Sequence, residues 1–373
     1  MKIWICLLLV LSMAMPVMAA PSEVPAKSAM LMDAATGTVL MEQNSHEPLA
    51  PASVTKVMTL LLVMEAIDRG ELGWEDTVTA SETAAAKGGS QVYLKAGETM
   101  TVTDMVKSIA VSSANDCACA MAEHLAGTED AFVERMNARA AELGMADTHF
   151  VNCTGLDDDP KAAEHRTSAH DIAIMSRELL TAHPKIREFT TIWMDTIRGG
   201  TFGLSNTNKL IRFYPGATGL KTGFTQGAGY CLSASAQRDG MELIAVVMGA
   251  ATSAQRFAAC KQMLDQGFAS YALIDPEPPE AQVEVALGTQ AYVEAVPGAR
   301  QPILIDKSQR SSVTTEVTLE PEVSAPVSRG QRLGTLTVKA GEQILAQIPM
   351  VAKDRVPRLT WGQMFVFVLK NMV

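Results

Sequence analysis

The chain has 373 residues, of which 47% are hydrophobic and 19% are charged, and its formal net charge is −10. This composition is typical of a globular protein with a sizeable core, and the length allows two or three domains. The acidic balance argues against a nucleic-acid partner, because nucleic-acid binding depends on clustered Lys and Arg.

The N-terminal segment 1–19 has the pattern of a secretory signal peptide. Lys2 supplies the positive start, an apolar stretch runs from Ile3 to Met15, and a small-residue cleavage site ends at Ala19. We therefore expect cleavage after Ala19 and an exported protein. The alternative is an uncleaved anchor, which is disfavoured because the apolar stretch is shorter than the ~20 residues that span a bilayer.

A β-hairpin and a buried helix are the first elements expected in the mature chain. The apolar runs AMLM and TVLM flank DAATG within residues 28–43, which predicts two strands with Gly37 in the turn. Residues 53–67 follow, and only two of the residues from Val57 to Ile67 are polar. A helix that is apolar on every side is buried on every side, so we expect this helix inside the core.

Helices dominate the next part of the chain. Residues 103–143 have helical patterns in several pieces, and Thr128 is placed to cap a helix that ends near Gly144. The capping-box pattern SAHD at 168–171 precedes the apolar run IAIMSRELL and predicts another helix start. Asp171 is therefore interpreted as a helix cap rather than as a catalytic acid.

The first domain is expected to end with two strands and a helix. Residues 229–250 predict two strands joined by a turn at 238–240, and residues 253–268 predict a helix. The Pro- and Glu-rich stretch DPEPPEA at 275–281 then predicts a linker. We accordingly expect a first domain over residues 20–275.

A small all-β domain is expected over residues 282–352, which contain short β-like runs such as VEVAL, TTEVTL and LGTLTV and no candidate catalytic cluster. Five apolar residues of the tail 357–373 follow helical spacing: Trp361, Met364, Phe365, Val368 and Met372. Four basic residues lie nearby and would meet anionic lipid headgroups: Lys353, Arg355, Arg358 and Lys370. We expect an amphipathic helix in the membrane interface; the alternative is a final strand, because MFVFVL has high β propensity.

Six cysteines are present, and Cys6 would leave with the signal peptide. The other five are an odd number and cannot all pair within one chain: Cys117, Cys119, Cys153, Cys231 and Cys260. Their spacing does not match a zinc site. We expect small buried residues rather than a disulfide framework, and neither a metal nor an organic cofactor.

The strongest chemical signal is Ser53-x-x-Lys56 at the head of the buried helix. A spacing of three residues places both side chains on one helix face. Burial lowers the pKa of a lysine because it disfavours the charged form, and a neutral amine can accept the serine proton. Ser53 and Lys56 are therefore candidates for a nucleophile and its base.

Two further motifs follow in order, Ser113-Ala-Asn115 and Lys221-Thr222-Gly223. With Ser53-x-x-Lys56 they resemble the three-motif signature of the penicillin-recognising serine acyl-transferases. The blocks PASVTK, SSAND, NTNKL, GLKTGFT and AGYCLSASA look like the low-molecular-mass penicillin-binding proteins that are D-Ala-D-Ala carboxypeptidases. The resemblance covers nearly the whole mature chain.

That resemblance implies an α/β penicillin-binding, serine β-lactamase-like domain with an antiparallel sheet flanked by helices, then the all-β domain and the tail. Its substrate would be the terminal D-alanine of peptidoglycan stem pentapeptides, and β-lactam antibiotics would be inhibitors. The protein would lie peripherally on the outer face of the cytoplasmic membrane. The alternatives are a serine β-lactamase, although no Glu-x-x-Leu-Asn pattern lies between Asn115 and Lys221, and a catalytically silent wall-binding protein.

Roles follow for named residues. Ser113 would pass a proton to the leaving amine, Asn115 would hold Lys56 or the substrate amide, and a strand carrying the third motif would bind an extended peptide. Lys221 and Thr222 suit a terminal carboxylate, and Gly223 allows close approach. By resemblance, the backbone N–H groups of Ser53 and Phe224 form an oxyanion hole.

Five other residues are given a weaker interpretation or no catalytic role. Arg256 corresponds in position to a family arginine that helps hold the terminal carboxylate; the alternative is an ordinary solvated helix arginine. Thr154 stands where some members carry His, and Thr218 where many carry Asp. His165, like His170, is expected to be structural or exposed.

Overall fold

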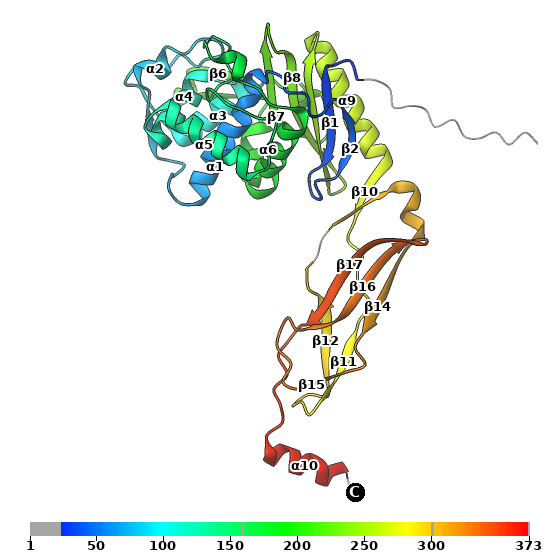
Figure 1. Cartoon of the computed structure of the whole chain (residues 1–373). Helices are drawn as coiled ribbons and strands as arrows, with labels where there is room; N and C mark the ends of the chain where they lie inside the picture. The colour runs from blue at the N-terminus through cyan, green and yellow to red at the C-terminus, as the bar shows by residue number, and fades with distance from the viewer. Residues whose placement is uncertain (1–23, 159, 300–301, 372–373) are drawn as a thin grey trace, which may run out of the picture.

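The computed structural model describes residues 24–158, 160–299 and 302–371. The predicted signal peptide and Met372 lie outside the described residues. Five antiparallel strands form the central sheet of the first domain in the order β2-β1-β9-β8-β7 (Figure 1). Their bounds are β1 Ser28–Asp33, β2 Val39–Gln43, β7 Ala217–Thr225, β8 Gly229–Arg238 and β9 Met241–Ala250.

Helices cover both faces of this sheet, as Figure 1 shows. The longer helices on one face are α1 Lys56–Asp68, α3 Val102–Ser112, α4 Asn115–Ala126, α5 Glu129–Glu142 and α6 Ala169–Ala182; the long helix on the other is α9 Ser253–Ser270. Shorter elements are η1 Ala52–Thr55, α2 Glu82–Ala85, α7 Arg187–Thr190, α8 Leu210–Phe213, β3 Thr77–Thr79, β4 Thr99–Thr101, β5 Met194–Ile197 and β6 Phe202–Ser205. The predicted sheet flanked by helices is confirmed.

The position of β9 between two layers of helices explains why its sequence is a continuous apolar run. Ile244, Val246 and Met248 belong to the core beneath α1 and α6, whereas Leu243, Ala245 and Val247 belong to the core beneath α9. Alternate side chains of a strand point to opposite faces, so a strand covered on both faces has no polar side. The hydrophobic effect therefore stabilises both layers of the domain through this strand.

Local signals in the sequence placed several elements correctly. The hairpin β1–β2 turns at Gly37, whose φ is +73°, and β8–β9 turns at Gly240, whose φ is +79°. Thr128 Oγ1 accepts the N–H of Ala131 at the start of α5, and Ser168 Oγ accepts the N–H of Asp171 at the start of α6. These caps satisfy N–H groups that have no partner inside the helix.

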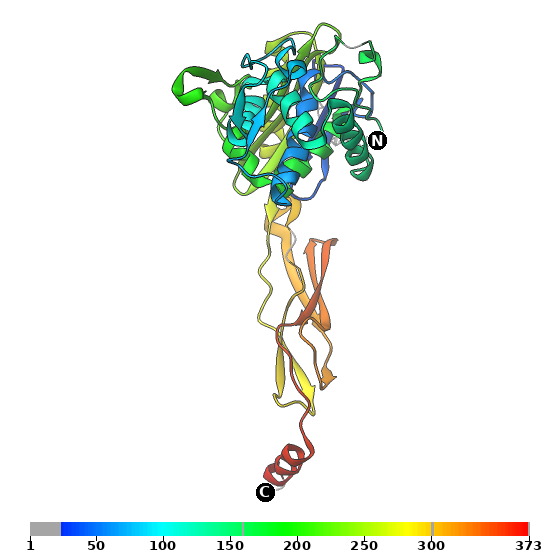
Figure 2. The same ribbon diagram turned by 90° about the vertical axis from the view of Figure 1, so that its left-hand side faces the viewer.

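The second domain contains a six-stranded sheet in the order β14-β16-β17-β12-β11-β15. Its strands are β11 Gln282–Ala286, β12 Tyr292–Pro297, β14 Val313–Leu319, β15 Glu322–Ser324, β16 Arg332–Ala340 and β17 Gln343–Ala352, and β10 Tyr271–Ile274 pairs with β13 Ile303–Asp306 beside it. The pairing of β10, before the predicted linker, was not expected from the sequence. Figures 1 and 2 show this domain extending away from the first.

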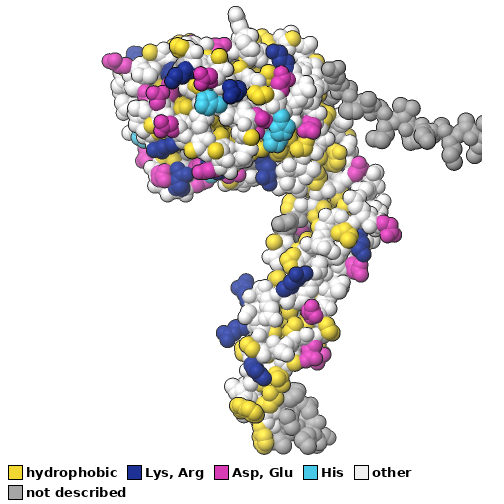
Figure 3. Space-filling model, in the orientation of Figure 1, with side chains coloured by type: hydrophobic (Ala, Val, Ile, Leu, Met, Phe, Trp, Pro, Cys, Tyr) yellow, Lys and Arg dark blue, Asp and Glu magenta, His cyan; other side chains and the backbone are white. Residues whose placement is uncertain are grey.

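The tail forms a helix, α10 Trp361–Asn371, at the far end of the second domain (Figures 1 and 2). The alternative of a final strand is wrong. Trp361 is 92% exposed and Phe365 is 67% exposed, and Figure 3 shows hydrophobic side chains gathered at this end. Within the described residues, no helix combines the length and the apolar character needed to cross a membrane.

Candidate active site

Ser53 and Lys56 lie side by side where η1 passes into α1. Lys56 Nζ donates to Ser53 Oγ at 2.9 Å and to the backbone carbonyl of Thr154 at 2.7 Å. Ser53 is partly exposed as a residue, whereas Lys56 is 0% exposed. An amine in contact with a hydroxyl is the arrangement in which lysine can act as a base toward serine.

Burial lowers the pKa of Lys56 from its ordinary value of 10.5 to about 7. The desolvation of the charged form is the largest cause, and nearby Cys153 and Asp116 oppose it. With a pKa of about 7, a substantial share of the Lys56 amine is unprotonated at neutral pH. The prediction that burial tunes Lys56 is therefore confirmed in direction.

A chain of hydrogen bonds that includes His165 and Thr55 stabilises the turn that carries Ser53. His165 Nδ1 accepts the N–H of Val151 at 3.1 Å, so Nε2 carries the proton and donates to Thr55 Oγ1 at 2.7 Å. Thr55 Oγ1 in turn donates to the carbonyl of Ala52 at 2.8 Å. His165 thus has the structural role that the sequence predicted, next to the nucleophile.

Gly155 completes this support. A β-carbon at this position would lie 1.8 Å from the carbonyl oxygen of Ala52, and its φ is +79°. Only glycine combines that backbone conformation with such a close approach. No local pattern of residues indicates this contact, because the two segments are about a hundred residues apart.

Ser113 and Asn115 lie at the junction of α3 and α4. Ser113 has φ +64°, an uncommon conformation for a residue other than glycine. Asn115 donates from Nδ2 to the carbonyl of Gly88 at 2.7 Å, and no hydrogen bond joins it to Lys56. Among the described residues, Ser113 Oγ and Asn115 Oδ1 are buried without a hydrogen-bond partner. Buried polar atoms in this state are uncommon and mark candidate contacts for a bound molecule.

The motif Lys221-Thr222-Gly223 lies within β7, the strand at one edge of the sheet. Lys221 is 1% exposed, and its Nζ donates to the carbonyl of Thr222 at 2.8 Å. Burial, followed by the charges of Lys56 and Arg256, holds the pKa of Lys221 well below its ordinary value. Thr222 Oγ1 donates to Thr207 Oγ1 at 2.7 Å.

Phe224 and Arg256 flank the outer end of this motif. Phe224 is 51% exposed and packs on Tyr230, with 4.3 Å between ring centroids. Arg256 is 6% exposed, and its Nη1 donates to the carbonyls of Gly223 at 2.9 Å and Cys231 at 3.1 Å. The alternative of a solvated helix arginine is wrong, because the guanidinium is buried against β7 and β8.

The two departures from the family pattern have structural explanations. Thr154 contacts Lys56 through its backbone carbonyl, so that contact does not depend on the side chain. The hydroxyl of Thr218 lies 2.7 Å from Glu242 Oε1, and Glu242 pairs with Arg187. A carboxylate therefore lies beside position 218, although it comes from β9.

The five described cysteines are all buried and unpaired, as expected: Cys117, Cys119, Cys153, Cys231 and Cys260. Burial raises the pKa of several of these thiols, which makes them poor nucleophiles. The nucleophile candidate remains Ser53.

Comparison with known proteins agrees with this geometry. The family model described as D-alanyl-D-alanine carboxypeptidase matches residues 15–252, and the model described as the C-terminal domain of penicillin-binding protein 5 matches residues 270–358. The fold and the site thus define a penicillin-binding serine acyl-transferase. The chain belongs to the D-alanyl-D-alanine carboxypeptidase family.

Individual relatives support the same assignment. The D-alanyl-D-alanine carboxypeptidase DacF of Bacillus subtilis is 45% identical over 336 residues, which are 88% of this chain and 85% of that protein. The structure of penicillin-binding protein 5 from Haemophilus influenzae superimposes with a TM-score of 0.77 and 29% identity, covering 91% of this chain and 99% of that one. Penicillin-binding protein D2 of Listeria monocytogenes, solved in an ampicillin-bound form, gives a TM-score of 0.59 and 32% identity, covering 67% of this chain and 100% of that one.

Proposed function

We propose that the protein removes the terminal D-alanine from peptidoglycan stem pentapeptides through an acyl-enzyme on Ser53. Lys56 accepts the proton of Ser53 as the hydroxyl oxygen attacks the carbonyl carbon of the scissile peptide bond. The bond between that carbon and the D-alanine nitrogen then breaks, and the proton taken up by Lys56 is relayed through the hydroxyl of Ser113 to the leaving amine. Water hydrolyses the ester and restores Ser53.

One observation carries this proposal further than the motifs alone. Lys56, Lys221 and Arg256 are buried close enough for their charges to affect one another. In the described part of the chain, none of the three forms a salt bridge with Asp or Glu. Without an anionic partner the charged form of a buried basic group is disfavoured, which is why the pKa of Lys221 is lowered. The carboxylate of a terminal D-alanine would supply a negative charge beside Lys221 and Arg256, which favours their charged forms.

Strand β7 also fits an extended peptide. It is an edge strand of the sheet, so a peptide can add to it through main-chain hydrogen bonds, and Asn115 Oδ1 is available to a substrate amide. Gly223 lies close to the backbone nitrogen of Ser53, which is compatible with the oxyanion hole that the family resemblance assigns to the N–H groups of Ser53 and Phe224. Such donors stabilise the negative charge that develops there in the transition state.

β-Lactam antibiotics are proposed as inhibitors, because their ring carbonyl resembles the scissile bond and they carry a carboxylate. A serine β-lactamase would hydrolyse them rapidly instead, and a silent wall-binding protein would not react with them. Rapid turnover of nitrocefin would support the first alternative. Failure to label with a fluorescent penicillin would support the second.

The central experiment incubates purified protein with diacetyl-Lys-D-Ala-D-Ala and measures released D-alanine. We expect release by the natural protein and none by Ser53→Ala, with penicillin labelling lost in parallel. Circular dichroism of the variant checks that it is folded. Normal labelling of folded Ser53→Ala would place the nucleophile elsewhere.

For location, we propose export and a peripheral position on the outer face of the cytoplasmic membrane. Support comes from the signal-peptide pattern of residues 1–19 and from the exposed aromatic side chains of α10. Arg355 and Arg358 are exposed just before α10, whereas Lys353 pairs with Glu294 at 2.7 Å. Arg355 and Arg358 are therefore the basic residues best placed to meet lipid phosphates.

A further inference from the structure

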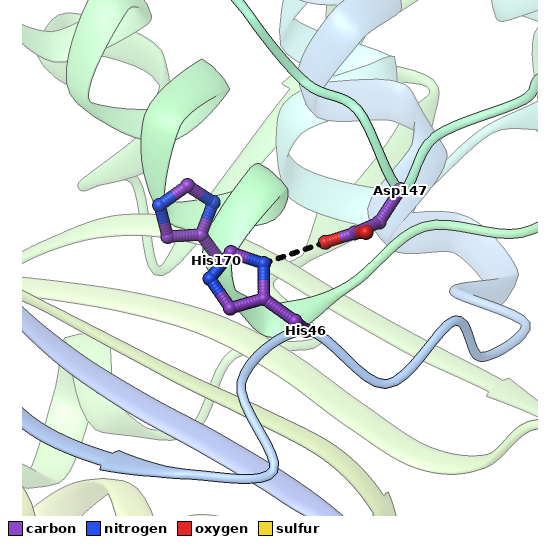
Figure 4. A group of neighbouring side chains, drawn as sticks. All are labelled: His46, Asp147 and His170. Carbon is purple, nitrogen blue, oxygen red and sulfur yellow. Dashed lines mark hydrogen bonds and ion pairs between the residues drawn. The ribbon is translucent and has the colours of Figure 1, made fainter.

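Three metal-binding side chains from distant segments meet on the surface of the first domain: His46, Asp147 and His170 (Figure 4). His46 follows β2, Asp147 follows α5, and His170 lies in the first turn of α6. One ligand atom of each residue lies within 4.8 Å of the other two. None of the three belongs to the acyl-transfer site described above.

The separations fit coordination of one small cation. His46 Nδ1 lies 2.8 Å from Asp147 Oδ2, and the rings of His46 and His170 have centroids 4.2 Å apart. Two ligands at zinc's usual bond lengths of about 2.0–2.1 Å and tetrahedral angles lie about 3.3 Å apart. Small side-chain rotations would therefore bring the three ligand atoms around one ion.

The buried carboxylate of Asp171 contacts two of these three residues in the absence of a metal. Asp171, 1% exposed, lies 3.1 Å from His170 Nδ1 and accepts the backbone N–H of Asp147 at 2.8 Å. The backbone of His170 also donates to the carbonyl of Ser45, next to His46. Outer carboxylates of this kind orient histidine ligands, so the ligands are arranged before a metal arrives.

We propose that His46, Asp147 and His170 bind one divalent transition-metal ion of the Zn²⁺ class. Two imidazoles and a carboxylate suit zinc and its neighbours, whereas Ca²⁺ and Mg²⁺ prefer oxygen ligands throughout. Asp147 and Asp171 together balance the double positive charge. The side chain of His46 is 62% exposed, so water can supply the remaining ligand.

The bound metal has a structural effect on the segment that leads to the nucleophile. His46 is seven residues before Ser53, and residue Leu49 between them is tied to Thr167 by two backbone hydrogen bonds. A metal that links this segment to α6 adds a further restraint on the same loop. Because only the folded chain brings the ligands together, the metal raises the stability of the fold by mass action.

The test titrates ZnCl₂ into metal-free protein and follows heat by calorimetry and the melting temperature by scanning. We expect one saturable site and a rise in melting temperature. His46→Ala and Asp147→Asn should each weaken binding by about tenfold or more, and His124→Ala, which removes an exposed histidine of α4, should bind as the natural protein does. Equal melting temperatures of the metal-free proteins show that the variants are folded.

Co²⁺ provides a second readout, because its visible absorption reports coordination geometry and ligand type. Bands of a nitrogen and oxygen site that vanish in His46→Ala support the proposal. Three results overturn it: no saturable binding, unchanged Zn²⁺ affinity in both His46→Ala and Asp147→Asn, or a thiolate-to-cobalt band that persists in these variants. The last would place the ion on the buried cysteines instead.

Discussion

Gly223 lies against the turn that carries Ser53, at a distance that leaves no room for a side chain. A β-carbon at Gly223 would lie 2.6 Å from the carbonyl oxygen of Pro51 and 3.1 Å from the backbone nitrogen of Ser53. The third sequence motif and the nucleophile are thus in direct backbone contact. The position of β7 and the position of Ser53 depend on each other.

Gly223→Ala should therefore displace the nucleophile without unfolding the protein. Because a misplacement of about 1 Å can reduce a rate by about a hundredfold, we expect penicillin acylation to slow by that order. Stopped-flow acylation with a fluorescent penicillin measures it. Gly203→Ala is the matched control, since it lies in another strand with open space around its β-carbon position. Equal rates in both variants would show that the contact is unimportant.

Lys56→Arg should be inactive, because arginine remains protonated at ordinary pH and cannot accept the serine proton. We expect acylation to fall by about a hundredfold or more. In the natural protein, acylation should rise with pH through about 7, where Lys56 loses its proton. A pH–rate profile of single-turnover acylation tests both statements. Near-normal acylation by Lys56→Arg would exclude Lys56 as the base.

The lowered pKa of Lys56 also predicts how stability depends on pH. Between about 7 and 10.5 the unfolded chain binds a proton at this lysine that the folded chain does not. The free energy of unfolding should therefore fall as pH is lowered through this range, at about 1.4 kcal/mol per pH unit from this group.

Lys56→Met lacks this titration. Relative to the natural protein, we expect the variant to gain stability steadily from about pH 10 to about pH 7, then to show a constant difference at lower pH. Urea unfolding of both proteins across this range measures the difference. A difference that is independent of pH would mean that Lys56 is not shifted.

Arg256→Ala should weaken both recognition and structure, because the carbonyls of Gly223 and Cys231 lose their shared donor. We expect kcat/KM for the D-alanyl peptide to fall by about tenfold or more and the melting temperature to fall as well. Lys261→Ala, at an exposed position of the same helix, is the control. An unchanged kcat/KM would exclude a role for Arg256 in positioning β7.

Removal of residues 361–373 should release active enzyme from membranes. This cut preserves the backbone hydrogen bonds that join Thr289 to Pro357 and Leu359 to Leu287 in the second domain, which removal of 357–373 would break. The exposed apolar residues of α10 are lost, so binding to vesicles that contain anionic lipid should fall. Flotation with vesicles and the D-alanine assay measure both properties. Persistent flotation of folded, truncated protein would refute the anchor.

Local sequence patterns were sufficient wherever the determining contacts are close in the chain. The caps at Thr128 and Ser168, the turn at Gly37 and the apolar helix after Ser53 each depend on neighbouring residues, and the structure contains all of them. The pairing of β10 with β13 was missed because the two strands are separated by about thirty residues of intervening chain. Strand pairing is set by distant partners rather than by local propensity.

The sequence by itself determined the chemistry available at the site, since Ser53, Lys56 and the third motif could be read in order along the chain. Only the tertiary structure decided how that chemistry is tuned. Burial of Lys56 lowers its pKa. Packing of α9 on the sheet allows Arg256 to donate a hydrogen bond to the carbonyl of Gly223 in β7. The same is true of His46, Asp147 and His170, which lie up to 124 residues apart and meet only in the fold. Desolvation and proximity are properties of the packed chain, so no local pattern of residues can specify them.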